Sequence, residues 1–213
     1  MFSIIVSIKN ESIFNSILLP SLDNINKYIK DNNLLKYEII KVSGENSLCK
    51  NYNKGMSKAK FKLKFFIHED VDLLDNDNIS LFFKVNHIFM SFPKTGLVGL
   101  IGTTENPKGW WWNCSRDSIV GHLLSNEEYW NWNIDKPNSS VKLLDGLFLA
   151  TNTDINFSDD IEGFHFYDLD YCHKIIKANY DIKQIVHLVN HKSIIKDISK
   201  ISSEYYDSKW NNK

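Results

Sequence analysis

The stretch FKLKFFIHEDVDLL, residues 61–74, contains an apolar run that passes directly into a polar, acidic segment. Residues 63–67 end in three consecutive apolar side chains, which is typical of a strand buried on both faces of a parallel sheet. His68, Glu69, Asp70 and Asp72 follow this strand. Because ligands bind at the carboxyl ends of strands in open α/β sheets, this segment is the first candidate for a functional site.

Asp70 and Asp72 are separated by a single residue. In extended backbone, both side chains would point to the same side, where their like charges would repel each other. A hard divalent cation that carries a diphosphate would relieve this repulsion. The alternative is an ordinary acidic surface turn, in which D-x-D triplets are common. The position at the end of a buried strand favours the metal site.

The rest of the chain predicts strands and helices that alternate. Apolar runs predict strands over residues 2–8, 37–42, 96–101, 141–144, 147–150 and 182–186. Helical spacing predicts helices over residues 14–29, 46–58, 79–92, 166–178 and 194–210, with a break at Pro20. This order predicts an α/β fold with a central, mostly parallel sheet flanked by helices. We expect one domain over residues 1–213, with residues 196–213 as a C-terminal helical tail.

Composition narrows the class of protein. The chain has 213 residues, of which 43% are hydrophobic and 24% charged, as in a globular domain. A net charge of -1 does not favour a nucleic-acid partner. Three scattered cysteines fit reduced thiols and a cytoplasmic location. No apolar run approaches the ~20 residues that a membrane-spanning helix needs, so we expect no membrane span.

Tryptophan is concentrated in one region of the chain. Trp110, Trp111 and Trp112 are consecutive in a predicted loop, and Trp130 and Trp132 follow. Exposed aromatic rings mark binding surfaces, and they stack on the C–H faces of sugars. The alternative is that two of the three consecutive rings pack inside. We expect at least one of them to face a cleft.

Four segments together resemble the GT-A glycosyltransferases, in particular the glycosyltransferase-family-two-like bacterial group. They are FSIIVSIKNE, NYNKGMSKAKFKLKFFIHEDVDLL, LLDGLFLATN and GFHFYDLDYCHKIIKANYDIKQIVHLVNHKS. The resemblance implies a GT-A (nucleotide-diphospho-sugar transferase) fold. It also implies a Mn²⁺- or Mg²⁺-dependent transfer from a nucleoside diphosphate sugar, with a UDP-sugar favoured. The acceptor would be a saccharide or glycoconjugate, the transfer would be inverting, and the product would be a surface polysaccharide.

The resemblance also assigns the catalytic and metal-binding residues. It places Asp72 on the metal, Asp70 on the metal or the ribose, and His191 as a third ligand, with His187 as the competing histidine. Asp168 would be the general base, although many relatives have Glu-Asp where this chain has Tyr167-Asp168. The alternative is that Asp168 and Asp170 only cap the helix that follows. We expect Asp168 at a helix N-terminus to stay ionised at neutral pH.

The remaining expected contacts are with the nucleotide sugar and the acceptor. Candidates for the nucleotide sugar are Ser7, Asn10, Glu11, Ser43, Gly44, Lys50, Asn53, His68, Glu69 and Asp70. Lys50 and Asn53 fit an ordinary surface role equally well. Many relatives have an aspartate near Ser43 that contacts uracil, and this chain does not. Candidates for the acceptor are Trp111, Trp112 and Asp145, of which Asp145 has the alternative role of setting the turn before Gly146.

Two other functions are compatible with parts of the pattern. A nucleotidyltransferase would have a glycine-rich phosphate loop near the N-terminus, and the segment IVSIKNES has no glycine. A non-catalytic module that binds sugars or nucleotide sugars would suit the tryptophans. Such a module needs no leaving-group metal, so Asp72, Asp168 and His191 together favour an enzyme.

Overall fold

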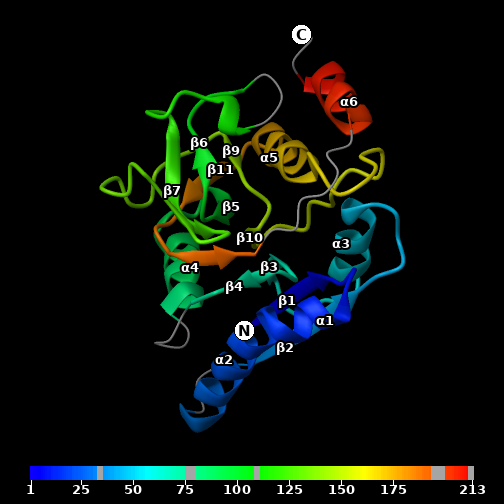
Figure 1. Ribbon diagram of the computed structural model, residues 1–213, viewed down its shortest axis with the longest axis vertical. Coiled ribbons are helices and arrows are strands. Elements are labelled where there is room, and N and C mark those ends of the chain that lie inside the picture. The colour runs from blue at the N-terminus through cyan, green and yellow to red at the C-terminus, as the bar shows by residue number, and fades with distance from the viewer. Residues whose placement is uncertain (33–35, 75–79, 108–110, 193–199, 211–213) are drawn as a thin grey trace.

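The computed structural model describes residues 1–32, 36–74, 80–107, 111–192 and 200–210 (Figure 1). Its central sheet has six strands in the order β11-β5-β10-β3-β1-β2. β1 is parallel to β2 and β3, β11 is parallel to β5, and β10 is antiparallel to β3 and β5. The strands are β1 (Phe2–Ser7), β2 (Tyr37–Val42), β3 (Leu63–His68), β5 (Thr95–Gly99), β10 (Phe148–Thr151) and β11 (Asp181–Gln184). The predicted mostly parallel sheet is confirmed.

Helices cover this sheet, as the apolar spacing predicts. They are α1 (Glu11–Ser16), α2 (Leu18–Asn32), α3 (Leu48–Met56), α4 (Ser80–Ser91), α5 (Tyr167–Lys177) and α6 (Lys200–Trp210). The Asn10 side chain caps α1 by accepting hydrogen bonds from two backbone N–H groups. The predicted break near Pro20 falls at Ile17, which lies between α1 and α2. Pro20 itself lies in the first turn of α2, where its missing N–H costs little.

The central strand β3 is covered on both faces. Phe65, Phe66 and Ile67 have no exposed surface. The Phe65 ring packs edge-on against Phe2 and Phe82, at centroid distances of 5.2 and 4.7 Å. These residues anchor β3 in the core, so the polar residues that follow Ile67 emerge at the carboxyl edge of the sheet.

A second sheet, which the sequence pattern does not predict, lies beside the first. Its order is β4-β12-β7-β6-β9, and β8 pairs with β7. Its strands are β4 (Val71–Asp72), β6 (Gly102–Thr103), β7 (Ile119–Ser125), β8 (Glu128–Trp132), β9 (Leu143–Leu144) and β12 (Val189–His191). Residues 102–117, predicted as a loop, therefore contain β6 and the 3-10 turn Trp111–Asn113. The pairing of β12 with β4 brings a late segment of the chain to the end of β3.

The C-terminal helix α6 packs against α5 (Figure 1). Trp210 Nε1 donates a hydrogen bond of 2.9 Å to Asp170 Oδ1, and Lys209 Nζ lies 2.9 Å from the same oxygen. Asp170 is fully buried, so α6 supplies partners for a charge inside the fold. Of the predicted tail over residues 196–213, only this helix lies within the described residues.

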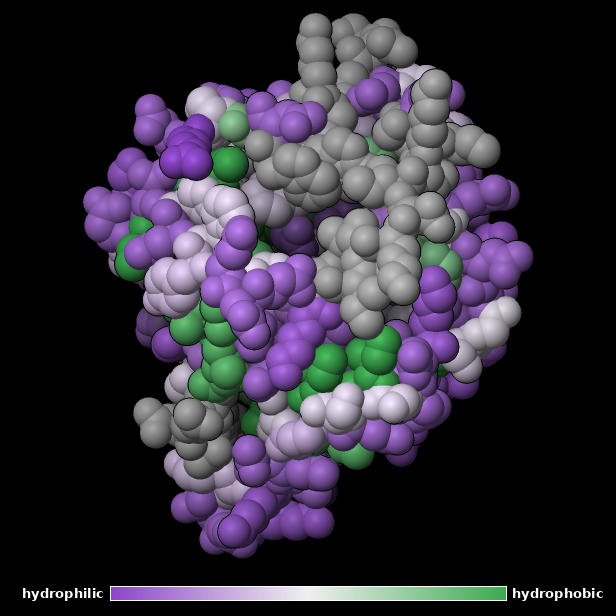
Figure 2. All heavy atoms as spheres, viewed as in Figure 1, coloured by the Kyte–Doolittle hydropathy of each residue, from purple (hydrophilic) through white to green (hydrophobic). Residues whose placement is uncertain are grey.

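The surface in Figure 2 is mostly hydrophilic, and apolar residues form small separate groups on this face. None of the helices in the described part of the chain combines the length and the apolar character that crossing a bilayer requires.

Candidate active site

The ends of β1 and β3 are fastened to each other. The Glu69 carboxylate accepts hydrogen bonds from the backbone N–H groups of Lys9, at 2.9 Å, and Asn10, at 3.0 Å. These contacts fix the turn after β1 against the turn after β3. Two of the predicted nucleotide-contacting segments are thereby held at the same carboxyl edge of the central sheet.

His68, Asp70 and His191 form a group that could hold a metal ion. One potential ligand atom from each residue lies within 4.8 Å of the others. His191 Nε2 is 3.4 Å from Asp70 Oδ1, and the rings of His68 and His191 are 5.8 Å apart. Two imidazoles and one carboxylate are a donor set that suits a divalent transition metal. The predicted ligands Asp70 and His191 are therefore brought together, and His68 joins them.

Burial and charge set the protonation of this group. Burial lowers the pKa of His68, which favours the neutral, metal-binding form of its ring. Burial alone would raise the pKa of Asp70, but hydrogen bonding to His191 and the nearby imidazoles hold it below its usual range. Burial would lower the pKa of His191, and the adjacent Asp70 raises it instead. Without a cation, both shifts favour a protonated His191 beside an ionised Asp70.

Asp72 lies outside this group. In β4, Val71 pairs with His191 and Asp72 pairs with Asn190, so alternation places Asp72 on the opposite face from His191. Its Oδ1 accepts hydrogen bonds from Ser21 Oγ, at 2.9 Å, and Leu74 N, at 3.1 Å. The expectation that Asp70 and Asp72 point to the same side fails, because Asp70 lies in a turn and not in extended backbone.

The competing histidine, His187, has a backbone partner. Its Nε2 donates to the carbonyl oxygen of Leu73, at 3.0 Å. His191, rather than His187, is the histidine placed beside Asp70.

Asp168 lies in the first turn of α5 and is held by backbone donors. Gly146 N donates to its Oδ2 at 2.8 Å, and Leu169 N donates to its Oδ1 at 2.9 Å. Burial and the charge of Asp145 nevertheless raise the pKa of Asp168 to about 7. The expectation of a fully ionised carboxylate at neutral pH is wrong, because burial and the neighbouring carboxylate outweigh the two backbone N–H groups.

Tyr167 links this aspartate to the metal-binding group. Its Oη is 2.6 Å from His68 Nε2. The contact depends on Gly146, since a Cβ at that position would lie 1.9 Å from Tyr167 Oη. Sequence reasoning missed this role, although the tyrosine in place of the relatives' glutamate was the signal that could have indicated it. Asp145 also contributes to the electrostatics of His68, Asp168 and His191, so all these groups share one site.

Asp145 also holds the tryptophan segment. Trp111 Nε1 donates to Asp145 Oδ2 at 2.8 Å, and Asp145 Oδ1 accepts from Leu147 N. Trp111 is only 7% exposed, so its ring belongs largely to the core. Trp110 and the side chain of Trp112 lie outside the described residues, and the expectation that one of them faces a cleft stays a prediction.

The other predicted nucleotide contacts lie at the ends of β1 and β2 and on α3. The Ser7 hydroxyl accepts from Asn51 Nδ2 at 3.0 Å, and Glu11 pairs with Lys41 at 3.1 Å. Ser43 is exposed and Gly44 has a φ of 97°, a turn conformation that favours glycine. Lys50 is exposed on α3.

Asn53, in contrast, has a structural role. Its side-chain amide donates to Phe157 O and Asp159 Oδ1 and accepts from Phe157 N. These bonds fasten the segment that precedes α5 to α3. These contacts support a structural role for Asn53, whereas its contact with a nucleotide stays a prediction.

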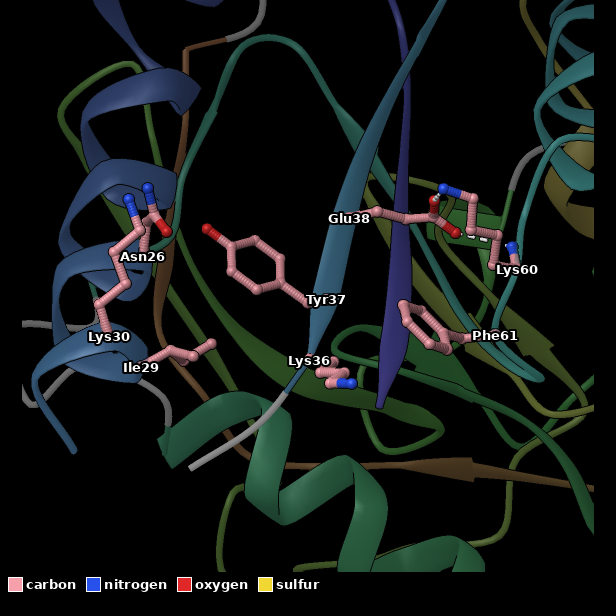
Figure 3. A pocket seen from close by; sticks show the side chains of 8 residues that line it. All are labelled: Asn26, Ile29, Lys30, Lys36, Tyr37, Glu38, Lys60 and Phe61. Atoms are coloured by element: carbon pink, nitrogen blue, oxygen red, sulfur yellow. Dashed lines mark hydrogen bonds and ion pairs between the residues drawn. The ribbon is translucent and has the colours of Figure 1, made fainter. Parts of the chain in front are cut away.

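A separate shallow pocket lies at the opposite edge of the sheet, beside the start of β2 and the residues that precede β3 (Figure 3). It is lined by Asn26, Ile29, Lys30, Lys36, Tyr37, Glu38, Lys60 and Phe61. Lys60 N donates to Glu38 Oε1 at its rim. None of the predicted site residues lines this pocket, so it is distinct from the group at the carboxyl edge.

Comparisons with known proteins show the family and the fold of the chain. A sequence profile described as "Glycosyltransferase like family" matches residues 3–213. No curated protein sequence matches the chain.

Solved structures with a similar fold include the mannosyltransferase PcManGT from Pyrobaculum calidifontis in complex with GDP-Man and Mn²⁺. It is 10% identical, has a TM-score of 0.52, and the match covers 96% of this chain and 59% of that chain. S. aureus TarS 1-349 in complex with UDP-GlcNAc is 12% identical, with a TM-score of 0.52 and coverage of 95% and 60%. The chain thus spans about three-fifths of the length of both of these solved chains. With its GT-A fold and a family match over nearly its whole length, the chain belongs to the glycosyltransferase-like family and is a glycosyltransferase.

Proposed function

We propose that this glycosyltransferase transfers a sugar from a nucleoside diphosphate sugar to a hydroxyl group of a saccharide or glycoconjugate acceptor. One observation carries the proposal: the Tyr167–His68 contact joins the candidate metal-binding group to the first turn of α5, which contains the candidate base Asp168. Glycosyl transfer needs positive charge for the leaving diphosphate and a base for the attacking hydroxyl. This site brings residues suited to both tasks into one place.

His68, Asp70 and His191 are proposed to hold a divalent cation, which would neutralise the charge that develops on the leaving diphosphate. The two imidazoles favour Mn²⁺ over Mg²⁺, which prefers oxygen ligands. His68 Nε2 is already paired with Tyr167, so Nδ1 is the ring nitrogen that remains for a metal. Tyr167 would orient the His68 ring through this contact.

Asp168 is proposed as the general base. It would accept the proton of the acceptor hydroxyl while the acceptor oxygen bonds to the anomeric carbon and the bond to the diphosphate breaks. This single displacement would invert the anomeric centre. A carboxylate with a pKa of about 7 is well matched to accepting a proton near neutral pH. The backbone N–H groups of Gly146 and Leu169 hold its orientation.

The donor is proposed to lie across the ends of β1 and β2. Ser7, Asn10, Glu11, Ser43, Gly44, Lys50, Glu69 and Asp70 are the proposed contacts. Similar folds occur in complexes with GDP-Man and with UDP-GlcNAc, which supports a nucleoside diphosphate sugar as the donor class. UDP-sugars are the first to test. We further propose that the acceptor belongs to the synthesis of a surface polysaccharide or glycoconjugate.

Release of nucleoside diphosphate from a panel of UDP-, GDP- and dTDP-sugars tests the proposal, with Mn²⁺ and with EDTA. We expect release from at least one donor in Mn²⁺, little in EDTA, and a loss of release in His191→Gln. The matched control is His187→Gln, because His187 donates to the Leu73 carbonyl and lies outside the candidate metal-binding group. Release that does not need the metal, or that survives in His191→Gln, would contradict the proposal.

A further inference from the structure

The hairpin formed by β7 and β8 carries aromatic side chains at the surface. β7 and β8 are antiparallel, and their pairs include Gly121 with Trp132, Leu123 with Trp130 and Ser125 with Glu128. Trp130 is 37% exposed. Its ring stacks on that of Trp132 at a centroid distance of 5.6 Å. An exposed tryptophan stack on a strand is a feature that the fold alone does not require.

The stack lies on the same face of the second sheet as His191. β12 runs parallel to β7, with Val189 beside Leu123 and His191 beside Ser125. Side chains of paired residues share a face, and those two residues apart also share it. The row of Trp130, Leu123 and Val189 is therefore adjacent to the row of Glu128, Ser125 and His191 on this face.

The stack also connects to the candidate site through Trp111. The Trp132 ring meets Trp111 edge-on at a centroid distance of 6.2 Å. Trp111 donates to Asp145, whose charge helps to raise the pKa of Asp168. Two independent routes, the sheet register and the ring contacts, thus lead from Trp130 to the candidate active site.

We propose that the exposed face of Trp130 is a subsite for a saccharide acceptor, with Glu128 and Ser125 as hydrogen-bonding partners of its hydroxyl groups. Trp132 stacks on one side of the Trp130 ring, and Trp130 keeps 37% of its surface exposed for a ligand. Sugars present apolar C–H faces to aromatic rings and hydroxyl groups at their edges, and this surface offers a partner for each. The assignment rests on the proposed function, because it supplies the acceptor for that transfer.

Tyr129 provides a matched control on the same strand. It is 59% exposed, so it is a more accessible aromatic residue than Trp130, which is 37% exposed. It pairs with Leu124 and contacts His122, which places it on the opposite face of the hairpin. A ligand that uses the face shared with His191 would not touch it.

The probe is an array of linear hexose and N-acetylhexosamine oligosaccharides, applied to the full chain and to folded variants checked by their melting temperature. We expect wild type and Tyr129→Ala to bind the same oligosaccharides with similar affinity. Trp130→Ala should bind them about tenfold more weakly, a typical effect for an aromatic contact. Trp130→Phe should recover part of the affinity, because it keeps a ring.

Equal binding by Trp130→Ala and wild type would overturn the inference, as would an equal loss in Tyr129→Ala. Vesicles of phosphatidylglycerol form a second arm. Binding to vesicles that depends on Trp130, without any oligosaccharide binding, would assign the surface to a membrane instead.

Mn²⁺-dependent nucleotide binding is measured on the same wild-type sample. If nucleotide binds while oligosaccharides do not, only this inference fails. If nucleotide does not bind either, the proposed function fails as well.

Discussion

Replacing Asp168 by asparagine is expected to stop transfer and, at alkaline pH, to stabilise the fold. Burial and Asp145 raise the pKa of Asp168 from 3.8 to about 7. The folded protein therefore binds this proton more tightly than the unfolded chain does. As a result, the contribution of Asp168 to the free energy of unfolding is present at low pH and is lost as pH rises from about 4 to about 7.

The size of this effect follows from the shift. Each tenfold change in proton affinity corresponds to about 1.4 kcal/mol, so a rise in the pKa from 3.8 to about 7 changes the free energy of unfolding by at most about 4 kcal/mol. Since Asp168 retains some contact with solvent, we expect about 2–4 kcal/mol. In a chain of this length, that corresponds to a change in melting temperature of roughly 5–15 °C. Asparagine also loses one of the two backbone hydrogen bonds, at a cost of about 1 kcal/mol that is the same at every pH.

The assay compares thermal unfolding of wild type and Asp168→Asn at pH 5 and pH 8, in EDTA and without donor. The variant should gain stability relative to wild type between pH 5 and pH 8, while its turnover at pH 8 with metal and saturating donor falls by about 10²–10⁴-fold. Asp170→Asn is the control, because it weakens a buried contact with Lys209 and should lower stability at both pH values. No gain for Asp168→Asn between the two pH values would refute the raised pKa, and near-normal turnover would refute the role as base.

Other changes test the contacts around the site. Gly146→Ala would place a Cβ 1.9 Å from Tyr167 Oη and 3.0 Å from Asp168 Cβ. Turnover should therefore fall at least about tenfold, which corresponds to an activation barrier higher by about 1.4 kcal/mol or more. Unchanged turnover would exclude a role for the Tyr167–His68 contact. Asp145→Asn removes a charge that raises the pKa of Asp168, so the midpoint of the rise in turnover with pH should move to lower pH; a midpoint that stays or rises would contradict this. Lys209→Met leaves Asp170 without its ionic partner and should lower the free energy of unfolding in urea by about 2–4 kcal/mol. Lys60→Met removes an exposed lysine from its ion pair and should lower it by less than about 1 kcal/mol. Equal losses would contradict a stabilising role for the Lys209–Asp170 contact between α6 and α5.

Much of the central sheet was predictable because its inner strands β1, β3, β5 and β10 are buried on both faces. The consecutive Phe65, Phe66 and Ile67 need apolar neighbours on each side, and only a sheet covered by helices supplies them. The second sheet was not predictable in the same way. The turn between β7 and β8 uses Asn126 and Glu127, both with positive φ, where an Asn-Gly pair would have indicated a hairpin. β12 has only three residues, too few for a periodic pattern to show.

The candidate site shows the same division. Asp70 could be singled out from the sequence because it follows a strand that the local pattern predicts, whereas His191 and Asp168 could be assigned only through the resemblance to glycosyltransferases. The position of Asp72 outside the group of His68, Asp70 and His191 depends on the pairing of β4 with β12, which sets the face of each side chain and which no local pattern contains. The pKa of Asp168 likewise depends on burial and on Asp145, which is 23 residues earlier in the chain. Tertiary contacts decide both points.

The most direct test of the central claim is calorimetric titration of UDP and GDP, with Mn²⁺ and with EDTA, into wild type, Asp70→Asn and Asp72→Asn. The amide introduced by Asp72→Asn would keep an oxygen for Ser21 and Leu74, so this variant is a conservative control. We predict Mn²⁺-dependent binding of at least one nucleotide to wild type and to Asp72→Asn, and binding about tenfold weaker or more in Asp70→Asn. Binding that persists in Asp70→Asn but is lost in Asp72→Asn, or the absence of any Mn²⁺-dependent binding in wild type, would contradict the assignment of the metal to His68, Asp70 and His191.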